Sequence, residues 1–139
     1  MNSCPVRPSD CHTCPGRVVC RCLQVTEEVL LEALTTFELR TITDELDHRV
    51  LLPTSHPLIR VTASDQEVQA IFTPDGRRWI FPRGDCVLLP VSNTTAELLA
   101  NYIGQRLLAA IQGRMGLKPT RLQVAVDENQ GQWGICELP

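Results

Sequence analysis

The spacing of hydrophobic positions between residues 27 and 52 is that of helices. Apolar side chains recur there at intervals of three and four residues, which predicts one helix over 27–38 and a second that restarts at 41–44. Thr26 suits the cap of the first helix, and Thr41 suits that of the second. Since proline cannot continue a helix, the second should end before Pro53.

The hydrophobic pattern then changes to that of strands. Three short segments alternate or run apolar, and the turn sequence at 74–76 separates the last two. The expected strands cover 58–62, 67–72 and 78–81, with a brief extended piece at 87–90.

Helical spacing returns in the last third and is followed by alternation. Thr94 and Glu97 have the spacing of a capping box, and Gly113 and Gly116 should end this long helix. The segments 121–128 and 132–138 read as a hairpin with its turn at 129–131. The fold class is therefore α+β, with helices packed on an antiparallel sheet and a C-terminal β-hairpin.

Composition narrows the class of protein. The chain has 139 residues, 43% of them hydrophobic, and a formal net charge of -3, so no global attraction for nucleic acid or an anionic membrane is expected. No apolar run reaches the roughly 18 residues that span a bilayer, and the N-terminus lacks the apolar core of a secretory signal. We therefore expect a cytoplasmic protein. Seven cysteines, an odd number, argue against a fully paired disulfide framework.

Three features are candidates for chemistry. Asp47 and His48 are adjacent, and a carboxylate that orients an imidazole can serve proton transfer, although a His at a helix end is the ordinary alternative. Thr94 and Thr95 open the long helix, where a simple cap is the alternative. Glu128 lies where an apolar strand face ends; it could accept two parallel N–H bonds from a 2-aminopterin or be solvated.

Together these features resemble a known family. The stretches ELDHRVLLP (45–53), FPRGDCVLLPVSNTTAELLANYIGQRLL (81–108) and LQVAVDENQGQWGICEL (122–138) resemble the 6-pyruvoyltetrahydropterin synthase / 6-carboxytetrahydropterin synthase family. The resemblance implies a partial T-fold, assembly into a homo-oligomeric ring and a pterin substrate, dihydroneopterin triphosphate. It implies a carbon–oxygen or carbon–carbon lyase that works by a zinc-assisted elimination.

The resemblance also implies roles for single residues. Asp47 and His48 would be the catalytic proton-transfer pair, Thr94 and Thr95 would lie in the substrate pocket, and Glu128 would anchor the pterin ring. The family's first hairpin carries an early His, a His-x-His pair that binds zinc, and a Cys. This chain has only three histidines and no His-x-His, and residues 1–44 stand where that hairpin would be.

The N-terminal cysteines suggest a separate function. Cys11, Cys14, Cys20 and Cys22 form a Cys-x2-Cys followed by a Cys-x-Cys, and thiolates are ligands for zinc and for iron–sulfur clusters. We expect zinc or a [2Fe–2S] cluster on these four thiolates, with Cys4 or His12 as substitutes for one of them. A thiol-rich tail without metal is the alternative.

The segment VVCRCLQVTEEVLLEALTTFELRTITDE (18–45) resembles the first half of a bacterioferritin-associated-ferredoxin-type [2Fe–2S] domain, whose second Cys-x2-Cys pair is absent here. The expected organisation is a Cys-rich half domain over 1–44 and a T-fold region over 45–139. The alternative functions are a small iron–sulfur or zinc-binding module, or a fusion of two incomplete domains that folds only in part. Cys86 and Cys136 are expected to be buried small hydrophobes.

Overall fold

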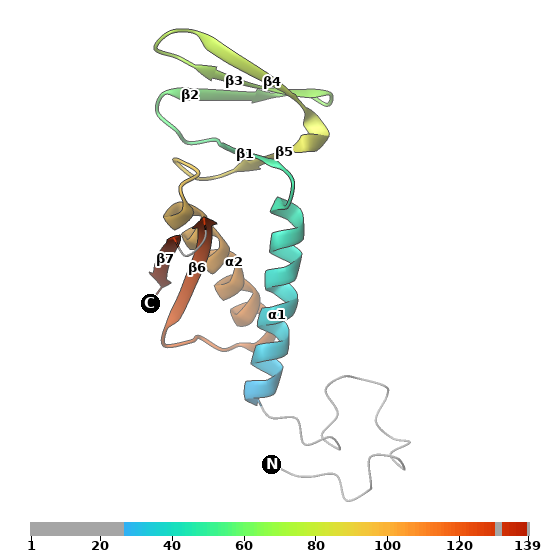
Figure 1. Ribbon diagram of the computed structural model, residues 1–139. Helices are drawn as coiled ribbons and strands as arrows, with labels where there is room; N and C mark the ends of the chain where they lie inside the picture. Colours follow the sequence, from blue (N-terminus) through green and yellow to red (C-terminus); the bar gives the residue numbers. More distant parts are fainter. Residues whose placement is uncertain (1–26, 130–131, 139) are drawn as a thin grey trace, which may run out of the picture.

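The computed structural model describes residues 27–129 and 132–138 (Figure 1). Two long helices, seven strands and one short 3-10 helix make up the described part. Their order is α1 (Glu27–Leu46), β1 (Val50–Pro53), β2 (Ile59–Ala63), β3 (Glu67–Phe72), β4 (Arg77–Pro82), the 3-10 helix Arg83–Asp85, β5 (Cys86–Leu89), α2 (Ala96–Met115), β6 (Leu122–Asn129) and β7 (Gln132–Leu138).

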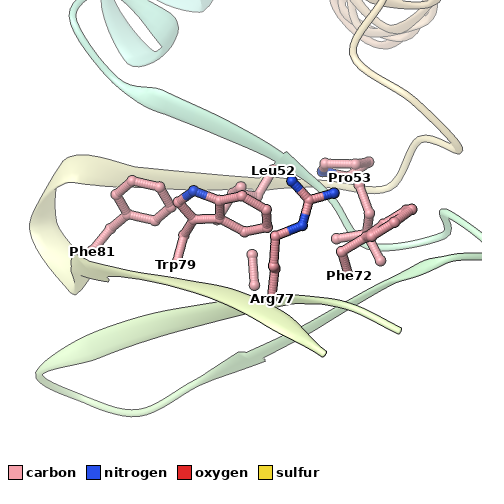
Figure 2. A pocket seen from close by; sticks show the side chains of 8 residues that line it. Leu52, Pro53, Phe72, Arg77, Trp79 and Phe81 are labelled. Atoms are coloured by element: carbon pink, nitrogen blue, oxygen red, sulfur yellow. The ribbon is translucent and has the colours of Figure 1, made fainter. Parts of the chain in front are cut away.

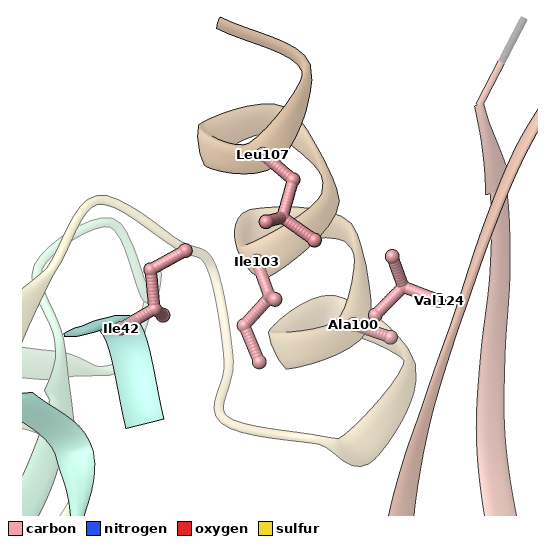
Figure 3. Packing of buried hydrophobic residues seen from close by; sticks show 5 residues of the cluster. All are labelled: Ile42, Ala100, Ile103, Leu107 and Val124. Carbon is pink, nitrogen blue, oxygen red and sulfur yellow. The ribbon is translucent and has the colours of Figure 1, made fainter. Parts of the chain in front are cut away.

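One layer consists of both helices and the C-terminal hairpin. The antiparallel strands β6 and β7 pair from Leu122 opposite Leu138 to Asn129 opposite Gln132, and α2 packs on both strands. The helix α1 packs on α2. The core between them contains Ile42, Ala100, Ile103, Leu107 and Val124 (Figure 3). The predicted hairpin and the predicted helix packing are therefore both present.

Strands β1 to β5 form a second, smaller part of the fold, which we call the β module. Strands β2, β3 and β4 form an antiparallel sheet, as the alternation predicted. Between this sheet and the helices, β1 pairs with β5 in parallel (Figure 1). The module has its own core of Leu52, Val68, Ala70 and Cys86. Cys86 is thus buried as expected, and Cys136 is half-buried.

The prediction of two helices before Pro53 is wrong. A single helix, α1, continues through Thr41 and ends at Leu46, and residues 50–53 form β1. The Thr41 hydroxyl donates a hydrogen bond to the carbonyl of Phe37 at 3.0 Å, four residues back. This hydroxyl is therefore hydrogen-bonded within α1 and does not cap a second helix. The expected boundary between residues 44 and 45 lies inside this helix.

The start of α2 is displaced by one residue from the predicted capping box. The N-cap is Thr95, whose Oγ1 accepts a hydrogen bond from the backbone N–H of Leu98 at 3.4 Å. The other end agrees with the prediction, because Gly116 caps α2 in the left-handed conformation at φ 66°. No helix in the described ranges is long and apolar enough to cross a bilayer.

Candidate functional site

Asp47 and His48 form an exposed pair directly after α1. Nδ1 of His48 lies 2.9 Å from Oδ1 of Asp47, and the two side chains are 92% and 68% exposed. His48 has φ 54°, a left-handed conformation that His tolerates better than bulky or β-branched residues. This residue turns the chain out of α1 and into β1, so the pair occupies the junction between the helical layer and the β module.

Thr94 and Thr95 lie at the start of α2 and have different local roles. The backbone N–H of Thr94 donates to the side-chain oxygen of Asn93 at 2.9 Å. Thr95 caps the helix, as described above, so its hydroxyl already accepts one hydrogen bond. Of the two threonines, only Thr94 has a side chain that is free of a capping role.

Glu128 occupies an irregular position in the hairpin. Asp127 is paired with Trp133 and Asn129 with Gln132, so two steps along β6 match one step along β7. Glu128 is therefore the extra residue of a β-bulge, a feature that breaks the simple alternation on which its predicted orientation was based. Bulges commonly re-aim side chains next to active sites.

A groove joins the regions that contain three of these features. It has a volume of about 680 Å³ and lies between α1, α2 and β6. Asp44 contributes from the last turn of α1, Asp47 from directly after that helix, Leu99 from the first turns of α2, and Asp127 from β6. We call this cavity the α1–β6 groove. The end of α1, the first turns of α2 and the bulged end of β6 surround this groove.

The groove follows the free edge of β6. The consecutive residues 124–127 all line it, and successive side chains of a strand point to opposite faces, so the groove runs along the strand's edge. Within the described ranges, β6 is paired only with β7. An edge of this kind is a template for another strand.

The structure assembles the predicted site only in part. Asp47 lines the groove, whereas His48, Thr94 and Thr95 are not among its lining residues. Asp44 and Asp127 line it and were not predicted. Asp127 could have been suspected from its position beside Glu128, but the approach of Asp44 depends on how α1 packs and leaves no signal in the sequence.

The described residues do not provide a zinc site of the kind the family resemblance implies. In residues 27–129 and 132–138, no three His, Cys, Asp or Glu side chains are placed to hold a metal ion. The Nδ1 atom of His56 accepts a hydrogen bond from the backbone N–H of Leu58 at 3.0 Å, and the Nδ1 atom of His48 faces Asp47. Cys11, Cys14, Cys20 and Cys22 lie outside the described residues, so their metal site stays a prediction.

The fold and the hairpin define a partial T-fold, and comparison with solved structures supports this class. The structure aligns with a 6-pyruvoyl tetrahydropterin synthase from Plasmodium vivax at a TM-score of 0.70 and 19% identity, covering 82% of this chain and 72% of that one. The corresponding synthase of Plasmodium falciparum gives a TM-score of 0.66 and 20% identity, covering 76% and 66%. These matches confirm the predicted fold class.

Sequence comparison leads to a particular relative. A segment of 97 residues is 30% identical to a Methanocaldococcus jannaschii protein named "Putative 6-carboxy-5,6,7,8-tetrahydropterin synthase", covering 70% of this chain and 58% of the relative. The chain thus spans less than two thirds of that relative's length. The predicted similarity to the 6-pyruvoyltetrahydropterin synthase / 6-carboxytetrahydropterin synthase family is confirmed.

No family model matches the chain. The resemblance of residues 18–45 to an iron–sulfur domain therefore gains no support from that comparison.

Proposed function

We propose that this protein binds a reduced pterin, with dihydroneopterin triphosphate as its substrate. The α1–β6 groove is the observation that carries the proposal. It brings Asp47 next to the first turns of α2 and to the bulged end of β6. The family resemblance seen in the sequence implies pterin-site roles for residues in all three places.

In this proposal Glu128 holds the pterin ring. The 2-amino group and the adjacent ring N–H of a pterin form a planar pair of donors that matches a carboxylate, as a guanidinium does. Two parallel, charge-assisted hydrogen bonds fix both the position and the rotation of such a ring. Thr94 would add a polar contact just before α2, because the helix is capped by the hydroxyl of Thr95 and not by that of Thr94.

His48 is the proposed proton acceptor, oriented by Asp47. A carboxylate beside Nδ1 favours the tautomer that carries its proton there, which leaves Nε2 free to take a proton from the substrate. Asp47 then stabilises the imidazolium that forms. The His48 ring is open to solvent, so a substrate can reach Nε2 without movement of the backbone.

The proposed site is completed by a second copy of the chain. Asp47 lines the groove, whereas His48 and the two threonines lie outside it, and the edge of β6 is open within the described part. A neighbouring subunit would supply both the missing wall and a partner for this edge. The proposal includes no metal-dependent step. The same proposal keeps the expectation from the sequence that the protein is cytoplasmic.

The proposal is tested by turnover and binding with matched variants. Full-length protein is incubated with dihydroneopterin triphosphate, and pterin products are separated by chromatography. Asp47→Asn and His48→Asn should abolish turnover and keep pterin binding, whereas Glu128→Gln should weaken binding itself by at least about tenfold. Asp65→Asn, a charge removal in the β2–β3 turn, is the control and should change neither. Absence of binding by the wild-type protein would refute the proposal.

A further inference from the structure

The β module contains a second cavity that the proposed function does not use. It has a volume of about 380 Å³ and lies between β1 and the inner face of the β2–β4 sheet. None of Asp47, His48, Thr94, Thr95 or Glu128 lines it. We call it the aromatic pocket, because Phe72, Trp79 and Phe81 form its walls together with Leu52 and Pro53 of β1 (Figure 2).

The strand register explains why this pocket exists. Arg77, Trp79 and Phe81 alternate along β4 and share one face. Across the sheet, Phe72 pairs with Arg77, and Ala70 pairs with Trp79. The small Ala70 side chain cannot fill the space in front of Trp79, so a hollow remains and Trp79 stays 47% exposed. A large aromatic left open inside a concave apolar site is a feature of ligand-binding surfaces.

A single positive charge stands at the mouth of the pocket. The Arg77 guanidinium carbon lies 5.5 Å from the centre of the Phe72 ring and 6.0 Å from that of Trp79. Figure 2 shows the Arg77 side chain extending between these two rings toward Pro53. Nε of Arg77 donates to Oδ2 of Asp75 at 2.6 Å. The guanidinium is therefore held by two aromatic faces and one carboxylate.

The terminal nitrogens of this guanidinium remain available. Neither Nη1 nor Nη2 of Arg77 makes a hydrogen bond to another described residue, and the side chain is 66% exposed. An arginine has five donors, and the paired terminal nitrogens match a carboxylate in geometry. Because Asp75 already offsets much of the positive charge, the site suits a single negative charge better than a doubly charged phosphate.

We propose that the aromatic pocket binds a flat aromatic carboxylate. The ring occupies the apolar space beside Trp79 and Phe81, and the carboxylate meets the terminal nitrogens of Arg77. The pocket volume is within the range of about 300–1,000 Å³ that is usual for small-molecule sites. The inference is independent of the proposed pterin function, because the two sites share no residue.

The test uses 2-naphthoate as the probe and the indole N–H resonance of Trp79 as the readout. The chain has two tryptophans, so a Trp133→Phe variant assigns the signal. Titration of the 15N-labelled full chain should shift the Trp79 resonance. Arg77→Gln should raise the Kd for 2-naphthoate at least about tenfold. Arg78→Gln, on the opposite face of the same strand, should change it less than about twofold.

Two further arms make the result decisive. The uncharged 2-naphthalenemethanol should bind equally to the wild-type protein and to Arg77→Gln, because it lacks the carboxylate. Arg77→Lys, which keeps the charge and loses the planar fork, should fall between wild type and Arg77→Gln. No shift of Trp79 up to the solubility limit of the probe would overturn the proposal. So would equal Kd values for 2-naphthoate in Arg77→Gln and Arg78→Gln proteins that give the same circular dichroism spectrum.

Discussion

Glu45 of α1 and Arg106 of α2, 61 positions apart in the sequence, form a two-pronged ion pair that joins the helices. Nη2 of Arg106 donates to Oε1 of Glu45 at 3.0 Å, and Nη1 donates to Oε2. Hydrogen bonding from Arg106 lowers the pKa of the Glu45 carboxyl below its ordinary value of 4.5. The pair fixes the orientation of α1 just before Asp47, so it supports the candidate site.

Replacing Glu45 with Gln should destabilise the protein by about 0.5–1 kcal/mol at neutral pH, a value reduced by solvent screening because both side chains are partly exposed. Since the folded pKa is lowered, this stabilisation is fully present above 4.5 and is lost as the pH falls through the folded pKa. Urea unfolding of wild type and Glu45→Gln checks this. A difference in unfolding free energy that stays constant down to about pH 3 would contradict it.

Gly134 sets the distance between β7 and α2. A Cβ added at this residue would lie 2.5 Å from the backbone carbon of Ala96 and 2.7 Å from the backbone nitrogen of Glu97. Gly134→Ala should therefore cost about 1–3 kcal/mol of stability, measured by thermal or urea unfolding. Gly113→Ala in α2 is the control, since nothing lies within 4 Å of its added Cβ. It should stabilise the protein by up to about 1 kcal/mol, and equal losses in both variants would refute this role of Gly134.

Substitutions of His48 can distinguish the requirement for its left-handed backbone conformation from the role of its imidazole. Its φ of 54° favours Gly and Asn over β-branched residues. His48→Asn should fold with wild-type stability, and His48→Val should lose about 1–2 kcal/mol. Both should lack proton transfer, so activity and unfolding midpoints will not correlate across the series. An equally stable Val variant would mean that the left-handed turn is not required.

The cysteine tetrad predicted from the sequence can be tested by metal analysis. Anaerobically purified protein should contain zinc, or the iron and sulfide of a [2Fe–2S] cluster with its absorption bands, bound by Cys11, Cys14, Cys20 and Cys22. A double Cys20→Ser and Cys22→Ser variant should lose the metal, whereas Cys136→Ser in the C-terminal hairpin should keep it. Metal-free, colourless wild-type protein would end this hypothesis.

The hydrophobic pattern predicted local elements better than the contacts between them. The alternation of Leu122, Val124 and Val126 predicted the hairpin, because these three side chains all point toward the same buried face. Thr41 misled the prediction, since a hydroxyl that suits a cap can equally bond back within a helix. The cap moved to Thr95 for a related reason: two adjacent threonines offer the same chemistry one residue apart.

Contacts between distant segments could not be predicted from the sequence. The parallel pairing of Val50 with Cys86 joins strands that are separated in sequence by all three strands of the β2–β4 sheet, and no local pattern specifies it. The approach of Asp44 and Asp127 to one groove depends on helix packing. The bulge at Glu128 adds one residue to β6, and alternation alone cannot reveal such an insertion.

The central claim, that the bulged end of β6 anchors a pterin, is tested most directly by calorimetric titration with dihydroneopterin triphosphate. Wild type and Glu128→Gln are compared, with Asp65→Asn as the charge-matched control. We expect saturable binding by wild type and by the control, and an affinity at least about tenfold weaker for Glu128→Gln. Equal affinity in all three proteins, or no binding by wild type, would contradict it.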